Sequence, residues 1–257
     1  MGDKTGIEWT DKTWNPWRGC HKVSQGCKNC YMFREQKQYG HNPNIVMRSK
    51  TTFDDPLKWK EPAKVFVNSW SDFFIEEADP WRAEAWDIIR RTPHLTYQIL
   101  TKRPENILDR LPKDWGTGWP NVWLGVSAED QENADKRIQQ LLEIPAAIRF
   151  VSAEPLLGPI WFEQSIYMAE RLPESEGWGL DWIIVGGESG PNCRPMDLAW
   201  ARSIRDECKE AGVTFFMKQM GGWPNKLGNI PEDLMIRQFP VLRKVEASKD
   251  WRSNDQR

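Results

Sequence analysis

Long apolar runs are absent from this chain of 257 residues, and no hydrophobic segment opens it. The sequence therefore predicts neither a membrane span nor a secretory signal, and we expect a cytoplasmic protein without a membrane partner. An excess of one charge is lacking as well, because 35 Lys and Arg are balanced by 37 Asp and Glu. With a net charge of −2, any binding of nucleic acid must come from a local basic patch.

Cysteine is scarce, with five in the chain, but three of them share one short loop. Cys20, Cys27 and Cys30 lie together, whereas Cys193 and Cys208 follow more than a hundred residues later. An odd number of cysteines, three of them crowded, indicates a reducing compartment and not a secreted disulfide scaffold. Three converging thiolates suit a metal centre, and three protein ligands leave one position open for chemistry.

No low-complexity segment or long linker divides the chain, so we expect a single domain over residues 1–257. Within it a short apolar run, a polar tip and a helical segment repeat about every 25–35 residues, which is the size of a βα unit. The apolar runs are 65–67, 97–100, 122–126, 148–151, 182–185 and 214–217. Their β-branched and aromatic residues are typical of buried parallel strands.

These units, with a possible first strand over residues 6–10, predict an α/β fold. We expect a partial or complete (β/α) barrel of six or seven parallel strands, with a doubly wound open sheet as the alternative. Capping residues and apolar periodicity predict helices over 79–90, 130–143 and 198–211. Residues 14–31 form the N-terminal three-cysteine loop, and residues from about 225 to 257 form a less regular C-terminal appendage.

Polar residues follow almost every predicted strand. In a barrel the ends of the strands meet at one mouth, where active sites lie. Helix caps explain an isolated Ser or Asp there, but carboxylates, hydroxyls and Lys or Arg around one rim suit a small zwitterionic ligand. The candidate site residues at these tips are Ser69, Ser71, Asp72, Lys102, Arg103, Ser127, Glu129, Glu154, Gly186, Gly187, Glu188 and Lys218.

Three kinds of metal centre remain open for the cysteine loop. Structural zinc would take His21 or His41 as its fourth ligand, but only Cys27 and Cys30 have the two-residue spacing that zinc sites favour. A four-cysteine electron-transfer cluster would recruit Cys193 or Cys208. The third kind is a 4Fe–4S cluster with three cysteine ligands and one open iron.

Several motifs carry a resemblance to a known family. The loop from Thr13 to Pro16 and from Ser24 to Tyr31, with Leu100–Pro104, Gly186–Gly190 and Phe216–Gln219, is similar to a phage-associated family of uncharacterised three-Cys-motif proteins. Its members look like divergent radical S-adenosylmethionine (SAM) proteins. Those proteins usually read Cys-x3-Cys-x2-Cys, whereas six residues separate the first two cysteines here.

The resemblance implies a radical SAM enzyme with a barrel of that type. Cys20, Cys27 and Cys30 would hold a 4Fe–4S cluster, and an electron donor such as flavodoxin or ferredoxin would reduce it. SAM would be cleaved to a 5′-deoxyadenosyl radical that attacks the substrate. By this resemblance, Ser69, Ser71 and Asp72 would bind the amine of SAM, and Lys102 or Arg103 would bind its carboxylate. Ser127 and Glu129 would bind the ribose, and Tyr31 would face the adenine. Glu154, Gly186, Gly187, Glu188 and Lys218 would bind SAM or substrate.

The substrate expected from the phage association is a nucleic acid or nucleotide, with a peptide or small molecule nearly as plausible. A basic bias after the cysteines supports it, carried by Arg34, Lys37, Arg48, Lys50, Lys58, Lys60 and Lys64. The chain has sixteen Trp, most of which we assign to the core, while Trp14 and Trp17 are candidates to stack on bases. The alternative is a non-enzymatic binding module, stabilised by zinc or a cluster, that acts with a partner protein encoded nearby.

Overall fold

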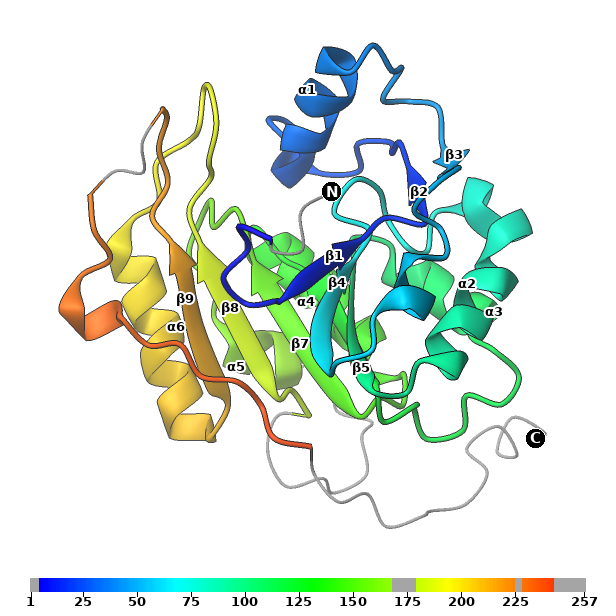
Figure 1. The fold of residues 1–257 in the computed structure, drawn as a ribbon. Coiled ribbons are helices and arrows are strands. Elements are labelled where there is room, and N and C mark those ends of the chain that lie inside the picture. The colour runs from blue at the N-terminus through cyan, green and yellow to red at the C-terminus, as the bar shows by residue number, and fades with distance from the viewer. Residues whose placement is uncertain (1–4, 168–178, 225–227, 243–257) are drawn as a thin grey trace.

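Seven parallel strands form one curved sheet that makes a half-barrel (Figure 1). A computed structural model describes residues 5–167, 179–224 and 228–242. The strands lie in the order β1, β4, β5, β6, β7, β8, β9, so neighbours in the sheet are also neighbours in the sequence. A doubly wound sheet would reverse its strand order at a switch point, so the fold is a partial barrel instead. The strands are β1 Lys12–Trp14, β4 Ala63–Val67, β5 Leu95–Thr101, β6 Val122–Ser127, β7 Ile148–Ala153, β8 Trp182–Gly186 and β9 Thr214–Gln219.

The six predicted apolar runs are all strands, but the expected first strand over residues 6–10 is wrong. The first strand is β1, whose residues 12–14 pair with residues 65–67 of β4. The preceding segment enters the barrel instead of pairing, because Trp9 packs edge-on against Phe66, with ring centroids 4.7 Å apart. Trp9 is 2% exposed.

The three predicted helices are confirmed as α2 Asp79–Arg91, α4 Gln131–Leu142 and α6 Leu198–Ala211. Asp130 caps α4 by accepting a hydrogen bond from the Asn133 amide, and Gly212 ends α6 with φ +68°. The remaining helices are α1 Tyr31–Gln38, α3 Ile107–Arg110 and α5 Phe162–Tyr167, with 3₁₀ turns η1 Gln25–Cys27, η2 Asp55–Lys58, η3 Glu76–Ala78, η4 Pro104–Asn106 and η5 Glu232–Leu234. A small antiparallel pair joins β2 Trp17–Arg18 to β3 Met47–Arg48. In the part of the chain described here, no helix has the length and apolar character needed to cross a membrane.

The two faces of the sheet are both buried, but by different partners. Outward-facing residues such as Val65 and Val126 belong to the main core, on which α4 and α6 pack. Inward-facing residues form a second cluster, the aromatic plug. Because side chains alternate along each strand, the plug packs inside the half-barrel, and two of its members, Trp9 and Phe66, form part of the wall of a cavity at the strand ends. The aromatic plug consists of Trp9, Phe66, Trp123, Phe150, Trp182 and Phe216.

Residues 228–242 of the expected C-terminal appendage pack along β9. The Met217 amide donates to the Ile236 carbonyl at 2.8 Å, and Phe239 lies against Trp182 with ring centroids 5.4 Å apart. This segment therefore closes the outer edge of the last strand. The rest of the predicted appendage, residues 225–227 and 243–257, lies outside the described residues.

Trp14 and Trp17 are core residues, so the expectation that they stack on bases is wrong. They are 1% and 0% exposed. Their indole nitrogens donate to the carbonyls of Phe53 and Asp72 at 2.9 and 3.0 Å. A buried ring whose nitrogen is already hydrogen-bonded has no face left for a ligand.

Candidate functional site

The three-cysteine loop leaves β1 and crosses the C-terminal ends of the strands before it enters α1 (Figure 1). Gly19 makes the first turn with φ +90°, and a Cβ there would lie 2.2 Å from the Ile45 carbonyl oxygen. A Cβ at Gly26 would lie 2.9 Å from the carboxyl carbon of Glu129. The glycines therefore allow the loop to lie directly on the rim of the barrel.

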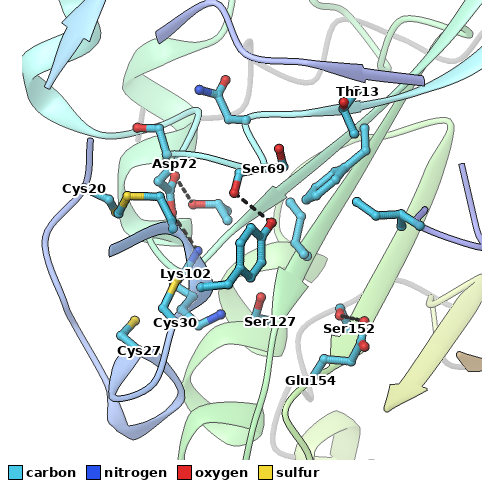
Figure 2. A pocket seen from close by; sticks show the side chains of 18 of the residues that line it. Thr13, Cys20, Cys27, Cys30, Ser69, Asp72, Lys102, Ser127, Ser152 and Glu154 are labelled. Carbon is cyan, nitrogen blue, oxygen red and sulfur yellow. Dashed lines mark hydrogen bonds between the residues drawn. The ribbon is translucent and has the colours of Figure 1, made fainter. Parts of the chain in front are cut away.

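The three thiols line one cavity of about 450 Å³ at the mouth of the barrel. Figure 2 shows their side chains gathered on one side, with Lys102 beside them and Ser152 and Glu154 across the cavity in this view. Most residues predicted for the site line this cavity. They are Cys20, Cys27, Cys30, Tyr31, Ser69, Ser71, Asp72, Lys102, Arg103, Ser127, Glu154 and Lys218.

The half-buried Cys20 and Cys30 lie in surroundings that disfavour the charged form of their thiols. Burial raises the pKa of Cys20 to about 12, and the nearby Asp72 carboxylate adds to the shift. Burial also raises the pKa of Cys30, which the positive charge of Lys102 partly opposes. The Arg103 guanidinium lies 3.7 Å from the Cys20 sulfur and donates to it. As free thiols Cys20 and Cys30 stay protonated, and a bound cation would be needed to favour their thiolates.

A single metal ion finds no ready-made set of ligands. In the described part of the chain, no group of three or more His, Cys, Asp or Glu side chains is placed to hold a metal ion. His21 lines the cavity, but its ring contacts Glu77 at 2.5 Å, and His41 is exposed after α1. Of the two remaining cysteines, Cys208 belongs to α6 and is 1% exposed in the core, and Cys193 is not among the residues that line the cavity.

Three carboxylates that follow alternate strands are each paired with an arginine. Asp72, after β4, lies 3.2 Å from Arg103, and Glu129, after β6, lies 2.9 Å from Arg137. The side chains of both pairs are at most 7% exposed. After β8, Glu188 lies 2.5 Å from Arg194. We call these the three carboxylate–arginine pairs.

Each pair contacts the three-cysteine loop at a different point. Arg103 donates to the His21 carbonyl at 3.0 Å, and the Gly26 amide donates to Glu129 at 3.0 Å. The Asn29 side chain donates to Glu188, also at 3.0 Å. The loop is therefore fixed next to Cys20, next to Cys27 and next to Cys30.

These contacts give Asp72, Glu129 and Glu188 a role that differs from the one expected. Asp72 also accepts from the Thr101 hydroxyl and the Lys102 amide, at 2.7 and 2.9 Å. Burial would raise the pKa of Glu129, but Lys102, Arg137 and hydrogen bonds outweigh it and hold this pKa below its ordinary value. Glu129 does not line the cavity. Its geometry favours anchoring the loop over contact with a ribose.

The groups left to face a ligand are fewer than the sequence predicts. Within the described residues, no hydrogen bond or ion pair engages the Lys102 ammonium. Ser127 is 3% exposed and lines the cavity. Tyr31 donates its hydroxyl to the Ser69 carbonyl at 2.8 Å, and the Ser71 hydroxyl donates to Gly19 at 2.6 Å. Ser69 and Ser71 therefore also hold the walls of the cavity in place.

Glu154 and Lys218 form an ion pair that faces the cavity. The Lys218 ammonium lies 2.8 Å from the Glu154 carboxylate, which also accepts from Ser152 at 3.1 Å. Gly186 is a glycine because a Cβ there would lie 2.4 Å from Glu154. A Cβ at Gly187 would lie 2.3 Å from the Gly221 backbone nitrogen. The two glycines thus serve packing within the protein, and of the two only Gly187 lines an adjoining cavity of about 150 Å³, together with Glu188.

Sequence reasoning missed part of the cavity wall. The cavity also includes Ile7 and Trp9 of the N-terminal segment, which carries no motif that would have placed it there. Asn68 directly follows β4, has φ +62° and is 3% exposed. It belongs to the polar tip predicted after this strand, but it was not assigned to the site. Thr101, Ser152, Ser189 and Gln219 lie in the predicted polar tips without an assigned role, and His21 was considered only as a zinc ligand. The other lining residues are Thr5, Gly6, Thr13, Met32, Phe33, Phe66 and Leu100.

Comparison with known proteins identifies a family but no characterised relative. Neither the curated proteins nor the solved structures contain a significant match to this chain. Residues 4–255 match a family described as a protein of unknown function, DUF5131. The match spans nearly the whole chain, including the three-cysteine loop and every strand of the half-barrel. The chain therefore belongs to the DUF5131 family.

Proposed function

We propose that this protein binds a 4Fe–4S cluster through Cys20, Cys27 and Cys30 and uses it to cleave SAM, as radical SAM enzymes do. One observation carries the proposal: three thiols from one loop line the same cavity at the mouth of a parallel half-barrel. That mouth is where barrel enzymes bind their ligands. The cavity continues past the thiols to the tips of β6, β7 and β9, which leaves room for a second ligand.

The chemistry of the thiols fits a cluster better than a single ion. Thiolates that share one zinc at about 2.3 Å lie about 3.8 Å apart, whereas the cysteines of a 4Fe–4S cluster each bind a different iron. Three thiols that face one cavity suit the second arrangement, in which each cysteine would bind its own iron. The Arg103 guanidinium donates to the Cys20 sulfur, and such hydrogen bonds tune the reduction potential of a cluster.

The chain's own residues would bind and orient SAM. Such a cluster, with one iron free of protein ligands, supplies the electron that breaks a carbon–sulfur bond of SAM. The unpaired Lys102 ammonium suits the SAM carboxylate, and its position beside Cys30 puts that group next to the metal. Tyr31 and Ser127 face the same cavity and suit the adenosine part. The large apolar rings of the aromatic plug, two of which line the cavity, would limit entry of water.

The test is anaerobic purification followed by metal analysis and SAM turnover. We expect brown protein with about four irons per chain, and 5′-deoxyadenosine after SAM and dithionite are added. Cys20→Ala, Cys27→Ala and Cys30→Ala should each lose the iron, while Cys193→Ala and Cys208→Ala should keep it. Colourless protein with one zinc, or an iron protein that leaves SAM intact, would contradict the proposal, and the zinc result would support the binding module.

A further inference from the structure

Basic charge is concentrated in the segment that forms the mouth of the barrel. Residues 17–50 contain seven Lys or Arg and one Glu, a net charge of +6, so the rest of the chain carries −8. Three of these cations, Lys28, Arg34 and Lys37, are exposed on the loop and on α1. In the described ranges none of the three forms an ion pair with an acidic side chain.

Exposed aromatic rings lie next to α1. Tyr39, after the helix, is 62% exposed, and its ring lies 5.9 Å from that of Trp70. Trp223 is 56% exposed, and the Arg34 guanidinium lies 5.7 Å from its ring. The single acidic residue of the segment, Glu35, accepts from the Trp70 indole at 2.9 Å and so holds that ring against the helix. We call Lys28, Arg34, Lys37, Tyr39, Trp70 and Trp223 the rim surface.

The rim surface lies beside the cavity. Arg34 and Tyr31 belong to the same helix, and Tyr31 lines the cavity. Arg34 also lies against Gly190, where a Cβ would be 2.7 Å from the guanidinium, and the neighbouring Ser189 lines the cavity as well. A ligand held on the rim surface therefore passes over the opening.

Exposed aromatic rings beside cations that form no ion pair with a described acidic side chain match one chemical class. Bases stack on exposed aromatic rings, and phosphates are neutralised by Lys and Arg. A duplex would hide the faces of its bases, and protein interfaces are depleted of Lys. We infer that the rim surface binds single-stranded nucleic acid and leads one nucleotide into the cavity. This inference rests on the proposed function for its chemistry, but not for binding itself.

Fluorescence anisotropy tests the inference without SAM or reductant. The probe is a labelled mixed-sequence single strand, made as DNA and as RNA, and compared with the DNA duplex of the same sequence. We expect tighter binding of single strands than of the duplex. Trp223→Ala and Tyr39→Ala should each weaken binding roughly fivefold to a hundredfold. The control Trp161→Ala removes a Trp that is 50% exposed outside the cavity and should change nothing.

Salt dependence tests the cations separately. Arg34→Ala and Lys37→Ala should each lower the slope of log K against log salt by about 0.7, whereas Lys209→Ala on α6 should leave it unchanged. Circular dichroism and iron content verify that each variant is folded and loaded. Equal affinity for single strand and duplex, or unchanged binding by both aromatic variants, would overturn the inference. So would displacement by poly-glutamate as effective as by unlabelled strand, which would indicate an acidic protein partner.

The two proposals fail in different ways. Strand binding that depends on Trp223 and Tyr39, in a protein that leaves SAM intact, would support the rim surface and contradict SAM cleavage. Cleavage of SAM without any binding of single strands at low salt would contradict the rim surface alone.

Discussion

At the residue scale, two neighbouring cations after β5 have different environments. Arg103 is 6% exposed and is held by Asp72, the His21 carbonyl and the Cys20 sulfur. Lys102 has no such partners in the described chain. Sequence reasoning assigned either one to the SAM carboxylate, because spacing alone cannot distinguish a side chain that is already paired from one that is free.

The structure therefore predicts opposite defects for the two alanine variants. Lys102→Ala should keep its iron and weaken SAM about tenfold to a hundredfold, because a charge-assisted contact contributes roughly 1.5–3 kcal/mol. Arg103→Ala should lose iron and stability, since it leaves the buried Asp72 carboxylate unpaired. Iron analysis and SAM titration of both proteins measure this. Equal SAM affinity in Lys102→Ala and the wild type would remove Lys102 from the ligand site.

Glu129 offers a second residue-scale prediction. Glu129→Gln should lower the free energy of unfolding by about 3 kcal/mol, because it leaves the buried Arg137 without its counter-charge. It should also lower iron retention, since the same carboxylate accepts from the Gly26 amide. Urea unfolding and iron analysis measure the two effects. The matched control is Glu132→Gln, on the exposed side of α4, which should alter neither.

The pH dependence of stability follows from the same carboxylate. The pKa of Glu129 is lower in the folded protein than in the unfolded chain, so the folded state binds fewer protons than the unfolded state as the pH falls. The stabilising contribution of the Glu129 carboxylate is complete above the ordinary Glu pKa of about 4.3 and is lost as the pH falls through the pKa of the folded state. The urea concentration at the unfolding midpoint of the wild type should therefore decrease as the pH is lowered below about 5. Glu129→Gln should show a flatter profile over that range, and parallel profiles would contradict the anchoring role.

At the element scale, the strands and helices could largely be predicted. Most strands are short β-branched or aromatic runs, Asp130 and Asp197 cap α4 and α6, and Pro80 lies in the first turn of α2. The first strand could not be predicted, since Lys12–Trp14 is short and starts with a charge. Ile7 and Trp9 give the preceding segment an alternating apolar pattern typical of a strand, but this segment forms no strand. The carboxylates after β4, β6 and β8 were predicted to meet at one rim. Their pairing with Arg137 and Arg194 could not be predicted, because those partners come from a helix and an irregular loop outside the strand-tip motifs.

The glycine turn after β8 gives a prediction at this scale. Gly187→Ala should lower the free energy of unfolding by about 1–3 kcal/mol, because its Cβ meets the Gly221 backbone, which cannot rotate away as a side chain can. Gly158→Ala is the control, since its Cβ has open space and should change stability by less than about 0.5 kcal/mol. Thermal unfolding of both variants measures the difference. Equal stability of the two would mean that the β8 and β9 turns do not approach so closely.

At the scale of the whole molecule, the abundance of Trp reflects how a half-barrel is closed. The sheet has an open side between β1 and β9, and the interior behind it must be filled by large side chains. Trp9 from the N-terminal segment, Trp123 from β6 and Trp182 from β8 do this in the aromatic plug. The sequence correctly assigned most Trp to the core, but it could not show which few remain on the surface, because exposure depends on contacts between distant segments.

Trp9 is the residue on which this closure depends most. It joins the plug through Phe66, Phe150 and Trp182, with ring centroids 4.7, 6.4 and 6.1 Å away, and it also lines the cavity. Trp9→Ala should therefore lower the free energy of unfolding by about 3–5 kcal/mol, the usual result of truncating a buried aromatic. At about 2–4 °C per kcal/mol, the Tm should fall by roughly 6–20 °C.

The ring, and not the hydrogen-bonding nitrogen, should account for that loss. The Trp9 indole nitrogen has no hydrogen-bond partner among the described residues, so Trp9→Phe should retain most of the stability. Calorimetry on Trp9→Ala, Trp9→Phe and the exposed control Trp161→Ala separates these effects. If Trp9→Ala unfolds at the same temperature as Trp161→Ala, the N-terminal segment does not belong to the core, and the cavity is open at the side as well as at the mouth.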